Sequence, residues 1–249
     1  MKYFLLVSSF LIVSVSLHAQ QIVHIENLRL GAASDTLSGS IDLNANFTQN
    51  INDIFNFNTT NNLQFVRGKN SLLLINNINL TVFNGNNIVN DGYSHLRYKR
   101  KLNDKLTWES FAQAQYNTII KVGFRSLTGT GLRWNIYEKD SLRLYFGSLA
   151  MTEYEEETTG IINRALRLSN YLSIGTPLGK NMFLDVITYF QPDVFYIKDF
   201  RTSTEASLII KISEKLSFKG SQSLFYDARP PEGIRNWFYI FRNGLMFEF

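Results

Sequence analysis

The stretch Trp237-Phe238-Tyr239-Ile240-Phe241-Arg242-Asn243-Gly244-Leu245-Met246-Phe247-Glu248-Phe249 decides the fold. One face of an extended strand would carry Trp237, Tyr239, Phe241, Leu245, Phe247 and Phe249. The other face would carry Arg242, Gly244 and Glu248, with Phe238, Ile240 and Met246 as apolar exceptions. Because successive side chains of a strand point to opposite faces, the stretch predicts a strand with one apolar wall and one mostly polar wall.

A sequence that ends on such a strand, with an aromatic residue last, resembles the closing strand of bacterial outer-membrane β-barrels. In that class of protein the barrel assembly machinery recognises the terminal aromatic residue. The resemblance implies this machinery as a partner, and an assembly signal made of Phe249, Phe247, Leu245 and Phe241.

Residues 1–19 have the features of a cleaved signal peptide. Lys2 supplies the positive charge, the run from Tyr3 to Leu17 is apolar apart from serines, and Ala19 is a small residue at the expected cleavage site. The run is too short for a spanning helix, which needs about 20 apolar residues. We therefore expect a signal peptide over 1–19, an N-terminal extension over 20–36 and one domain over 37–249.

Composition excludes several classes of site and partner. The absence of cysteine removes disulfides, thiolate metal sites and a lipid anchor on an N-terminal cysteine. The 25 basic and 21 acidic residues are nearly balanced and dispersed, so nucleic acid is not expected as a partner. Aromatic residues make up 14% of the chain, and aromatics favour strands and gather at membrane interfaces.

Polar turn clusters recur along the chain at nearly constant spacing. Short clusters lie at 67–70, 102–105, 138–141, 178–181 and 213–215, and longer connections are expected at 84–92, 117–122, 155–162, 191–199 and 227–235. With a first hairpin formed by 37–47 and 54–67, these turns predict about twelve antiparallel strands. Short turns at one end and longer loops at the other are typical of outer-membrane barrels, whose periplasmic turns are short.

The segments between the turns alternate in polarity. In the first, Leu37, Ile41 and Leu43 would face one way and Asp42 and Asn44 the other. A water-soluble lipocalin-like barrel or sandwich alternates equally well, but its packed interior could not satisfy so many Asn, Ser, Arg and Glu side chains. The pattern therefore favours an all-β, up-and-down transmembrane β-barrel with lipid outside and water inside.

From about Ser40 onward the chain resembles the salt-induced outer-membrane protein family, an outer-membrane β-barrel domain of unknown function. The strongest match runs from Leu96 to Glu157 and contains Tyr98, Leu106-x-Trp108, Phe124-Arg125, Gly129-x-Gly131-Leu132-Arg133 and the strand from Gly147. The resemblance implies a fold and an outer-membrane location, and it brings no catalytic residues.

Charged residues on the polar faces are candidates to line the lumen. By alternation they are Arg125, Arg133, Arg167, Arg201, Glu205, Lys211, Lys219 and Arg242. A lipid-facing Arg or Lys near the midplane would cost roughly 2–4 kcal/mol, so the lumen is where such side chains are tolerated. They could pair with each other and plug the barrel, or line a narrow pathway that favours small anions.

The sequence contains few candidates for catalytic or metal-binding residues. His95 is the one histidine on a predicted strand, but a lipid-cleaving barrel enzyme would need a serine two residues later, where this chain has Arg97. The acidic run Glu153-Tyr154-Glu155-Glu156-Glu157 is expected near the outer rim as a hydrated loop, with divalent cations or lipid head groups as alternative contacts. We expect no cofactor and no metal.

The sequence thus predicts a non-enzymatic outer-membrane β-barrel, either structural or a narrow pore for small solutes or ions. It would be a monomer in contact with outer-membrane lipids and lipopolysaccharide. A lipid-modifying enzyme, or a surface interaction module that uses the extracellular loops, is the alternative.

Overall fold

The computed structural model describes residues 36–139, 142–213 and 216–247. They form β1 (Thr36–Gln49), β2 (Asp53–Arg67), β3 (Asn70–Phe83), β4 (Asn86–Lys101), β5 (Leu106–Asn117), β6 (Val122–Lys139), β7 (Leu142–Glu157), β8 (Ile162–Leu178), β9 (Met182–Pro192), β10 (Phe200–Lys211), β11 (Leu216–Asp227) and β12 (Trp237–Phe247). Each strand pairs antiparallel with the next in a single 12-stranded sheet, so the predicted up-and-down order is confirmed. Within the described ranges no helix is both long enough and apolar enough to cross a membrane.

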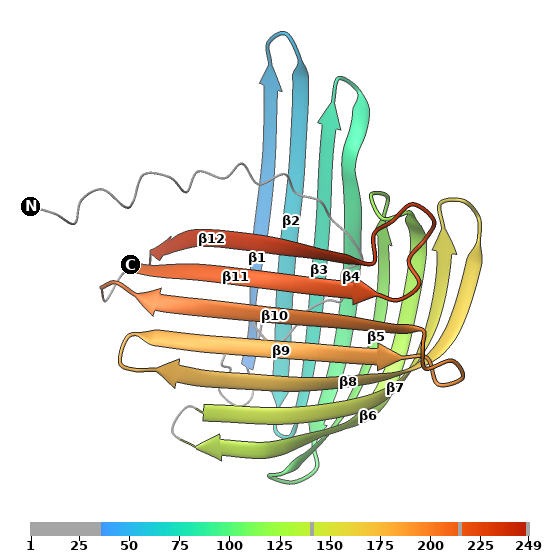
Figure 1. Cartoon of the computed structure of the whole chain (residues 1–249). Helices are drawn as coiled ribbons and strands as arrows, with labels where there is room; N and C mark the ends of the chain where they lie inside the picture. The colour runs from blue at the N-terminus through green and yellow to red at the C-terminus, as the bar shows by residue number, and fades with distance from the viewer. Residues whose placement is uncertain (1–35, 140–141, 214–215, 248–249) are drawn as a thin grey trace, which may run out of the picture.

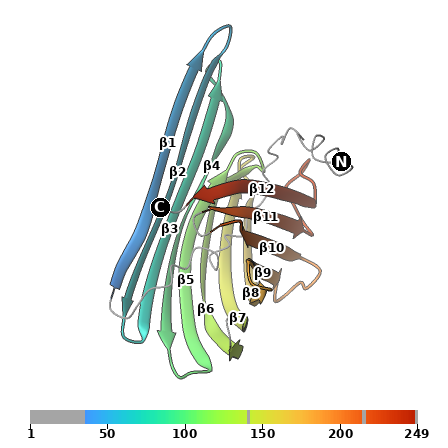
Figure 2. The same ribbon diagram turned by 90° about the vertical axis from the view of Figure 1, so that its left-hand side faces the viewer.

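The sheet curls strongly along its length. Figures 1 and 2 show β1 to β4 running in one direction while the later strands, up to β12, cross that direction. Such a change accumulates from the right-handed twist between successive strands. The described residues include no pairing between β1 and β12, so closure of the sheet into a cylinder stays a prediction.

The two faces of the sheet differ in chemistry. On β1 the apolar residues Leu37, Ile41, Leu43 and Phe47 are exposed on what we call the outer face. On the inner, concave face the middle strands bury charged side chains, including Arg125 and Glu153. An apolar outer wall around buried charges reverses the arrangement of a water-soluble barrel, whose interior is apolar.

The connections define two ends of the sheet. The short-turn end holds the β2–β3, β4–β5, β6–β7, β8–β9 and β10–β11 connections, and the long-loop end holds the others, including 193–199 and 228–236. The long loop expected at 84–92 is wrong, because β3 and β4 are joined by Asn84 and Gly85 alone. Their φ angles of 49° and 79° are those of a two-residue type I′ hairpin, which Asn-Gly favours.

Candidate functional site

The largest group of buried charges lies on the inner face near the long-loop end. We call Arg125, Glu153, Glu155, Arg167, Arg201, Asp199 and Asp227 the ion-pair layer. Strand alternation positions most of these side chains, because Arg125 on β6, Glu153 and Glu155 on β7, and Arg167 on β8 occupy inward positions of neighbouring strands. Arg201 and Asp227 are directly opposite each other on β10 and β11.

Glu153 is the centre of the ion-pair layer. Its carboxylate accepts a 2.6 Å hydrogen bond from Nε of Arg167, lies 3.2 Å from Nε of Arg125, and also pairs with Arg201. The side chain of Glu153 is 2% exposed, so these contacts are made out of water. A carboxylate at this depth is tolerated only when cations and hydrogen-bond donors compensate its charge.

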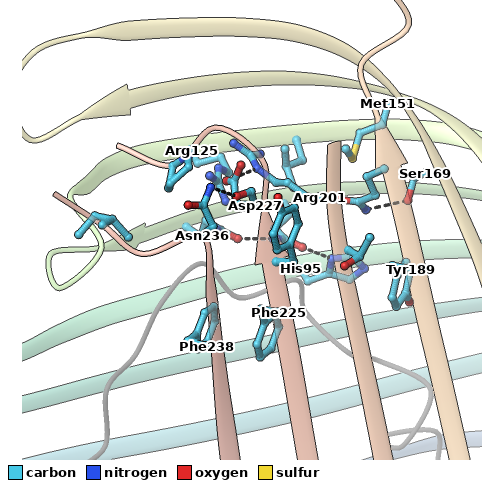
Figure 3. A pocket seen from close by; sticks show the side chains of 18 of the residues that line it. His95, Arg125, Met151, Ser169, Tyr189, Arg201, Phe225, Asp227, Asn236 and Phe238 are labelled. Carbon is cyan, nitrogen blue, oxygen red and sulfur yellow. Dashed lines mark hydrogen bonds and ion pairs between the residues drawn. The ribbon is translucent and has the colours of Figure 1, made fainter. Parts of the chain in front are cut away.

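Arg201 connects the two sides of the interior. From β10 its Nε donates to Asp227 at 2.8 Å, while its other nitrogens contact Glu153 and Glu155 on β7. Figure 3 shows Arg201 and Asp227 close together, with Arg125 beside them. The guanidinium group of Arg201 therefore links β7 to β10 and β11 across the interior of the curled sheet.

The ion-pair layer leaves little room. Three guanidinium groups face four carboxylates, so the charges nearly balance. The cavity beside them, which is also lined by His95 and by residues of the 228–236 connection, has a volume of about 40 Å³. Since one water needs roughly 10–15 Å³ of such volume, this space holds a few waters and no larger solute.

The acidic run 153–157 supplies two of the four carboxylates of the ion-pair layer, Glu153 and Glu155. The expectation of a hydrated loop at 153–157 is wrong, because β7 extends to Glu157 and the connection covers only 158–161. Glu153, Glu155 and Glu157 are all buried on the inner face. Glu156 points the other way and is exposed. Strand alternation could have identified this pattern, since the acids occupy every second position.

Toward the middle of the strands the interior becomes apolar. Leu149, Tyr171, Ile187 and Tyr189 are buried against one another, and Phe111 packs beside them; we call these residues the aromatic layer. Room for Tyr171 comes from Gly147 on β7, where an added Cβ would lie 2.1 Å from the Tyr171 ring. On β7 and β8 this layer lies between the ion-pair layer and the short-turn end.

Below the aromatic layer lies a second charged group, Arg97, Lys99, Glu109 and Arg133, which we call the basic layer. Glu109 is fully buried and accepts a 2.8 Å hydrogen bond from the Tyr171 hydroxyl. Its carboxylate lies 3.2 Å from Arg97 Nη1, 3.8 Å from Lys99 Nζ and 3.7 Å from Arg133 Nη1. The Arg133 guanidinium also stacks 3.7 Å from the Tyr145 ring centroid.

The remaining predicted site residues are more exposed. Glu205, Lys211, Lys219 and Arg242 all occupy inward positions of β10 to β12; Glu205 is half-buried and the other three are exposed. Phe241 and Leu245 are exposed on the outer face of β12. Phe247 ends β12 and Phe249 lies outside the described residues, so the assembly signal stays a prediction. The signal peptide over 1–19 and the extension over 20–35 also lie outside them.

His95 is a buried interior residue. Its Nδ1 lies 2.7 Å from Oε1 of Gln113, and its ring stacks on Phe111 with the centroids 5.5 Å apart. Its side chain is thus held by an amide and an aromatic ring. Arg97, two residues later, pairs with Glu109. Within the described ranges, no three His, Asp or Glu side chains are grouped so that they could hold a metal ion.

A family described as "Protein of unknown function, DUF481" matches residues 34–249. The chain belongs to the DUF481 family. No curated protein matches the sequence. Of the resemblance predicted from the sequence, this match supports membership of a family of unknown function.

Three solved structures resemble this DUF481 protein. The NanC porin is 12% identical with a TM-score of 0.49, over 87% of this chain and 100% of the porin. The translocator domain of the autotransporter NalP from Neisseria meningitidis is 9% identical with a TM-score of 0.38, over 86% and 87% of the two chains. A bacterial polysaccharide outer-membrane secretin is 10% identical with a TM-score of 0.44, over 86% and 91%.

Proposed function

We propose that the DUF481 chain is a non-enzymatic outer-membrane β-barrel whose interior is closed to solutes. The observation that carries this proposal is the ion-pair layer, in which Arg125, Arg167 and Arg201 are each paired with buried carboxylates. Water-filled pores keep a polar, hydrated lumen, whereas side chains paired across the interior fill it. The aromatic layer adds a dry barrier that would oppose the passage of ions.

The outer face supports a position in a bilayer. Aromatic rings form one row near the short-turn end, where Trp134 and Phe146 stack with centroids 5.8 Å apart. They form another near the long-loop end, where Phe124 packs against Tyr154. Such girdles flank the apolar band of transmembrane barrels.

The distance between the rows fits a bilayer. Phe124 and Trp134 are ten residues apart on β6. At about 3.3 Å per residue and a tilt of about 40°, they are separated by roughly 25 Å along the membrane normal, the height of the apolar band in such barrels. The outward positions between them carry Ser126, Thr128, Thr130 and Leu132, all uncharged. The signal peptide predicted at 1–19 would direct export of the chain from the cytoplasm, which an outer-membrane location requires.

Planar-bilayer recording tests the closed interior. The full chain is refolded into liposomes, its insertion is verified by flotation, and the liposomes are fused with the bilayer. We expect no discrete conductance steps from the wild type. A double variant, Arg201→Ala with Tyr171→Ala, removes one side chain from each blocking layer and should conduct, because water can then enter both layers.

The matched control is a double variant on the outer face, Leu224→Ala with Phe190→Ala, which should remain silent. Regular conductance steps from inserted wild-type protein would contradict the proposal and favour a narrow pore. Hydrolysis of phospholipid or lipopolysaccharide by the wild type, lost in His95→Ala, would favour the enzyme alternative.

A further inference from the structure

The β9–β10 connection carries four consecutive apolar residues that the proposed function does not use. We call Val194, Phe195, Tyr196 and Ile197 the apolar segment. All four are exposed, and Phe195 and Ile197 are 84% and 71% exposed. Figure 1 shows this connection projecting past the ends of β9 and β10. Because apolar surface in water is unfavourable, a cluster of large exposed apolar side chains marks a place where a protein or a membrane binds.

Hydrogen bonds of the backbone hold the apolar segment in a defined loop. The Oδ1 atom of Asp193 accepts bonds from the N–H groups of Phe195 and Tyr196, at 2.7 and 2.9 Å. The N–H of Asp193 donates to the carbonyl of Asp199 at 2.8 Å, and the N–H of Asp199 donates to the carbonyl of Tyr196 at 2.8 Å. A partner therefore would not have to order this loop on binding.

The connection begins at the aromatic row of the long-loop end. On the outer face beside it, the ring of Phe200 lies 5.6 Å from that of Phe190 on β9 and 5.5 Å from that of Tyr226 on β11. In transmembrane barrels such rings lie at the level of the lipid head groups. The apolar segment is thus next to the boundary between acyl chains and head groups.

Basic side chains flank the apolar segment. The connection starts beside β8, where the N–H of Val194 donates to the carbonyl of Leu166 at 2.7 Å. Arg164, two residues from Leu166 on the same face of β8, is exposed, and its guanidinium lies 5.6 Å from the centroid of the Tyr154 ring. Lys198 directly follows the apolar segment and is exposed. Cations at this level of an outer wall can reach lipid phosphates.

The charges around the apolar segment favour an anion. Arg229 adds a third exposed cation, since its guanidinium lies 5.1 Å from the centroid of the Tyr196 ring. Of the carboxylates, Asp199 is ion-paired in the interior and Asp193 accepts the two backbone bonds described above. Glu156 is exposed on the outer face of β7. Three exposed cations and one exposed carboxylate therefore flank the segment, which suits a phosphate better than a neutral head group.

We propose that residues 194–198 and Arg164 form a binding site for a phosphorylated lipid of the leaflet at the long-loop end. Phe195 and Ile197 would enter the acyl region, while Arg164 and Lys198 would donate charge-assisted hydrogen bonds to the phosphate oxygens. The inference rests on the membrane position proposed above. The site lies on the outer wall, so binding does not depend on whether the interior conducts.

Native mass spectrometry of the full chain, folded in detergent, tests the head-group preference. The ligands are diphosphorylated lipid A and the same lipid after removal of its phosphates. We expect one-to-one binding of lipid A with a clear preference over the dephosphorylated form. The double variant Arg164→Gln with Lys198→Gln should weaken binding of lipid A by about tenfold or more, because it removes two cations at the head-group level.

The matched control removes the same number of cations from exposed short turns, as Lys105→Gln with Lys180→Gln, and should bind lipid A like the wild type. Glu156→Gln should bind it at least as tightly as the wild type, because a repelling charge is removed. Equal binding of the two lipids, equal weakening by both double variants, or displacement of lipid A by inorganic phosphate would overturn the proposal.

Immersion of the apolar segment is measured in liposomes of phosphatidylcholine and lipid A. Ile197→Cys is labelled with bimane, whose fluorescence a nitroxide-labelled lipid quenches only within the bilayer. We expect strong quenching there and little at Glu232→Cys, which is exposed in the 228–236 connection. Protein that floats with liposomes but is not quenched at position 197 would contradict this site and leave the membrane position standing. Protein that does not float would contradict the membrane position itself.

Discussion

Glu153 shows how a single residue organises the interior. Its carboxylate meets Arg125, Arg167 and Arg201, which come from three different strands. Removing one partner of a buried ion pair leaves uncompensated charge, which costs about 3–5 kcal/mol. We therefore expect Glu153→Gln to lower the free energy of unfolding by about 3–5 kcal/mol in urea titrations of the liposome-inserted protein.

Glu156→Gln is the matched control for this variant. It makes the same chemical change three residues away on β7, but Glu156 is exposed and lies near a strand end. Its free energy of unfolding should stay within about 0.5 kcal/mol of the wild-type value. If both variants are equally stable, the ion-pair layer does not contribute to stability as we infer.

Alternation along the strands predicted the inward positions of the arginines, but it could not predict their partners. Arg201 on β10 meets Glu153 on β7, and these residues are 48 positions apart in the sequence. Contacts of this kind depend on how far the sheet curls, which polarity along a single strand does not encode. The acids also belong to a charged run next to a connection, and such runs are usually solvated.

At the scale of an element, the β3–β4 hairpin depends on its two turn residues. Gly85 has a φ angle of 79°, where a residue with a Cβ is strained by roughly 1–2 kcal/mol. Gly85→Ala should therefore lower the free energy of unfolding by about 1–2 kcal/mol, measured by urea titration in liposomes. Nothing lies within 4 Å of an added Cβ at this position, so strain of the backbone is the cause.

Gly244→Ala on β12 separates this effect from the general cost of replacing a glycine. An added Cβ there also meets nothing within 4 Å, and no positive φ angle is involved. Its stability should be unchanged or slightly higher, because alanine restricts the unfolded chain more than glycine does. A loss equal to that of Gly85→Ala would show that the turn geometry is not the cause.

This hairpin also explains why one connection was predicted too long. The residues after Phe83 are Asn84-Gly85-Asn86-Asn87, and so many polar residues resemble a loop by composition. The Asn-Gly pair is nevertheless the strongest local signal for a two-residue hairpin. The following polar residues are accommodated because the inner face accepts them; Asp91, for example, receives a 2.9 Å hydrogen bond from Asn79.

At the scale of the whole molecule, the interior differs from end to end. The ion-pair layer near the long-loop end has one more carboxylate than guanidinium groups. The basic layer near the short-turn end brings Arg97, Lys99 and Arg133 to the carboxylate of Glu109. Along β7 and β8 the aromatic layer lies between them, and Arg97 of the basic layer also lines the cavity beside the ion-pair layer.

Substituted cysteines test the whole arrangement at once, because the natural chain has none. Lys219 is exposed on the inner face, Ser203 is fully buried inside, and Leu224 is 47% exposed on the outer face. In liposomes, a charged thiol reagent that cannot cross lipid should label Lys219→Cys quickly, because the short-turn side of the interior is wet. Ser203→Cys and Leu224→Cys should react slowly, the first because packing excludes water and the second because lipid covers it.

All three variants should react alike after unfolding in urea, which controls for the intrinsic reactivity of the thiols. Rapid labelling of Leu224→Cys would mean that water contacts the outer wall, whereas rapid labelling of Ser203→Cys alone would keep the membrane position and remove the closed interior.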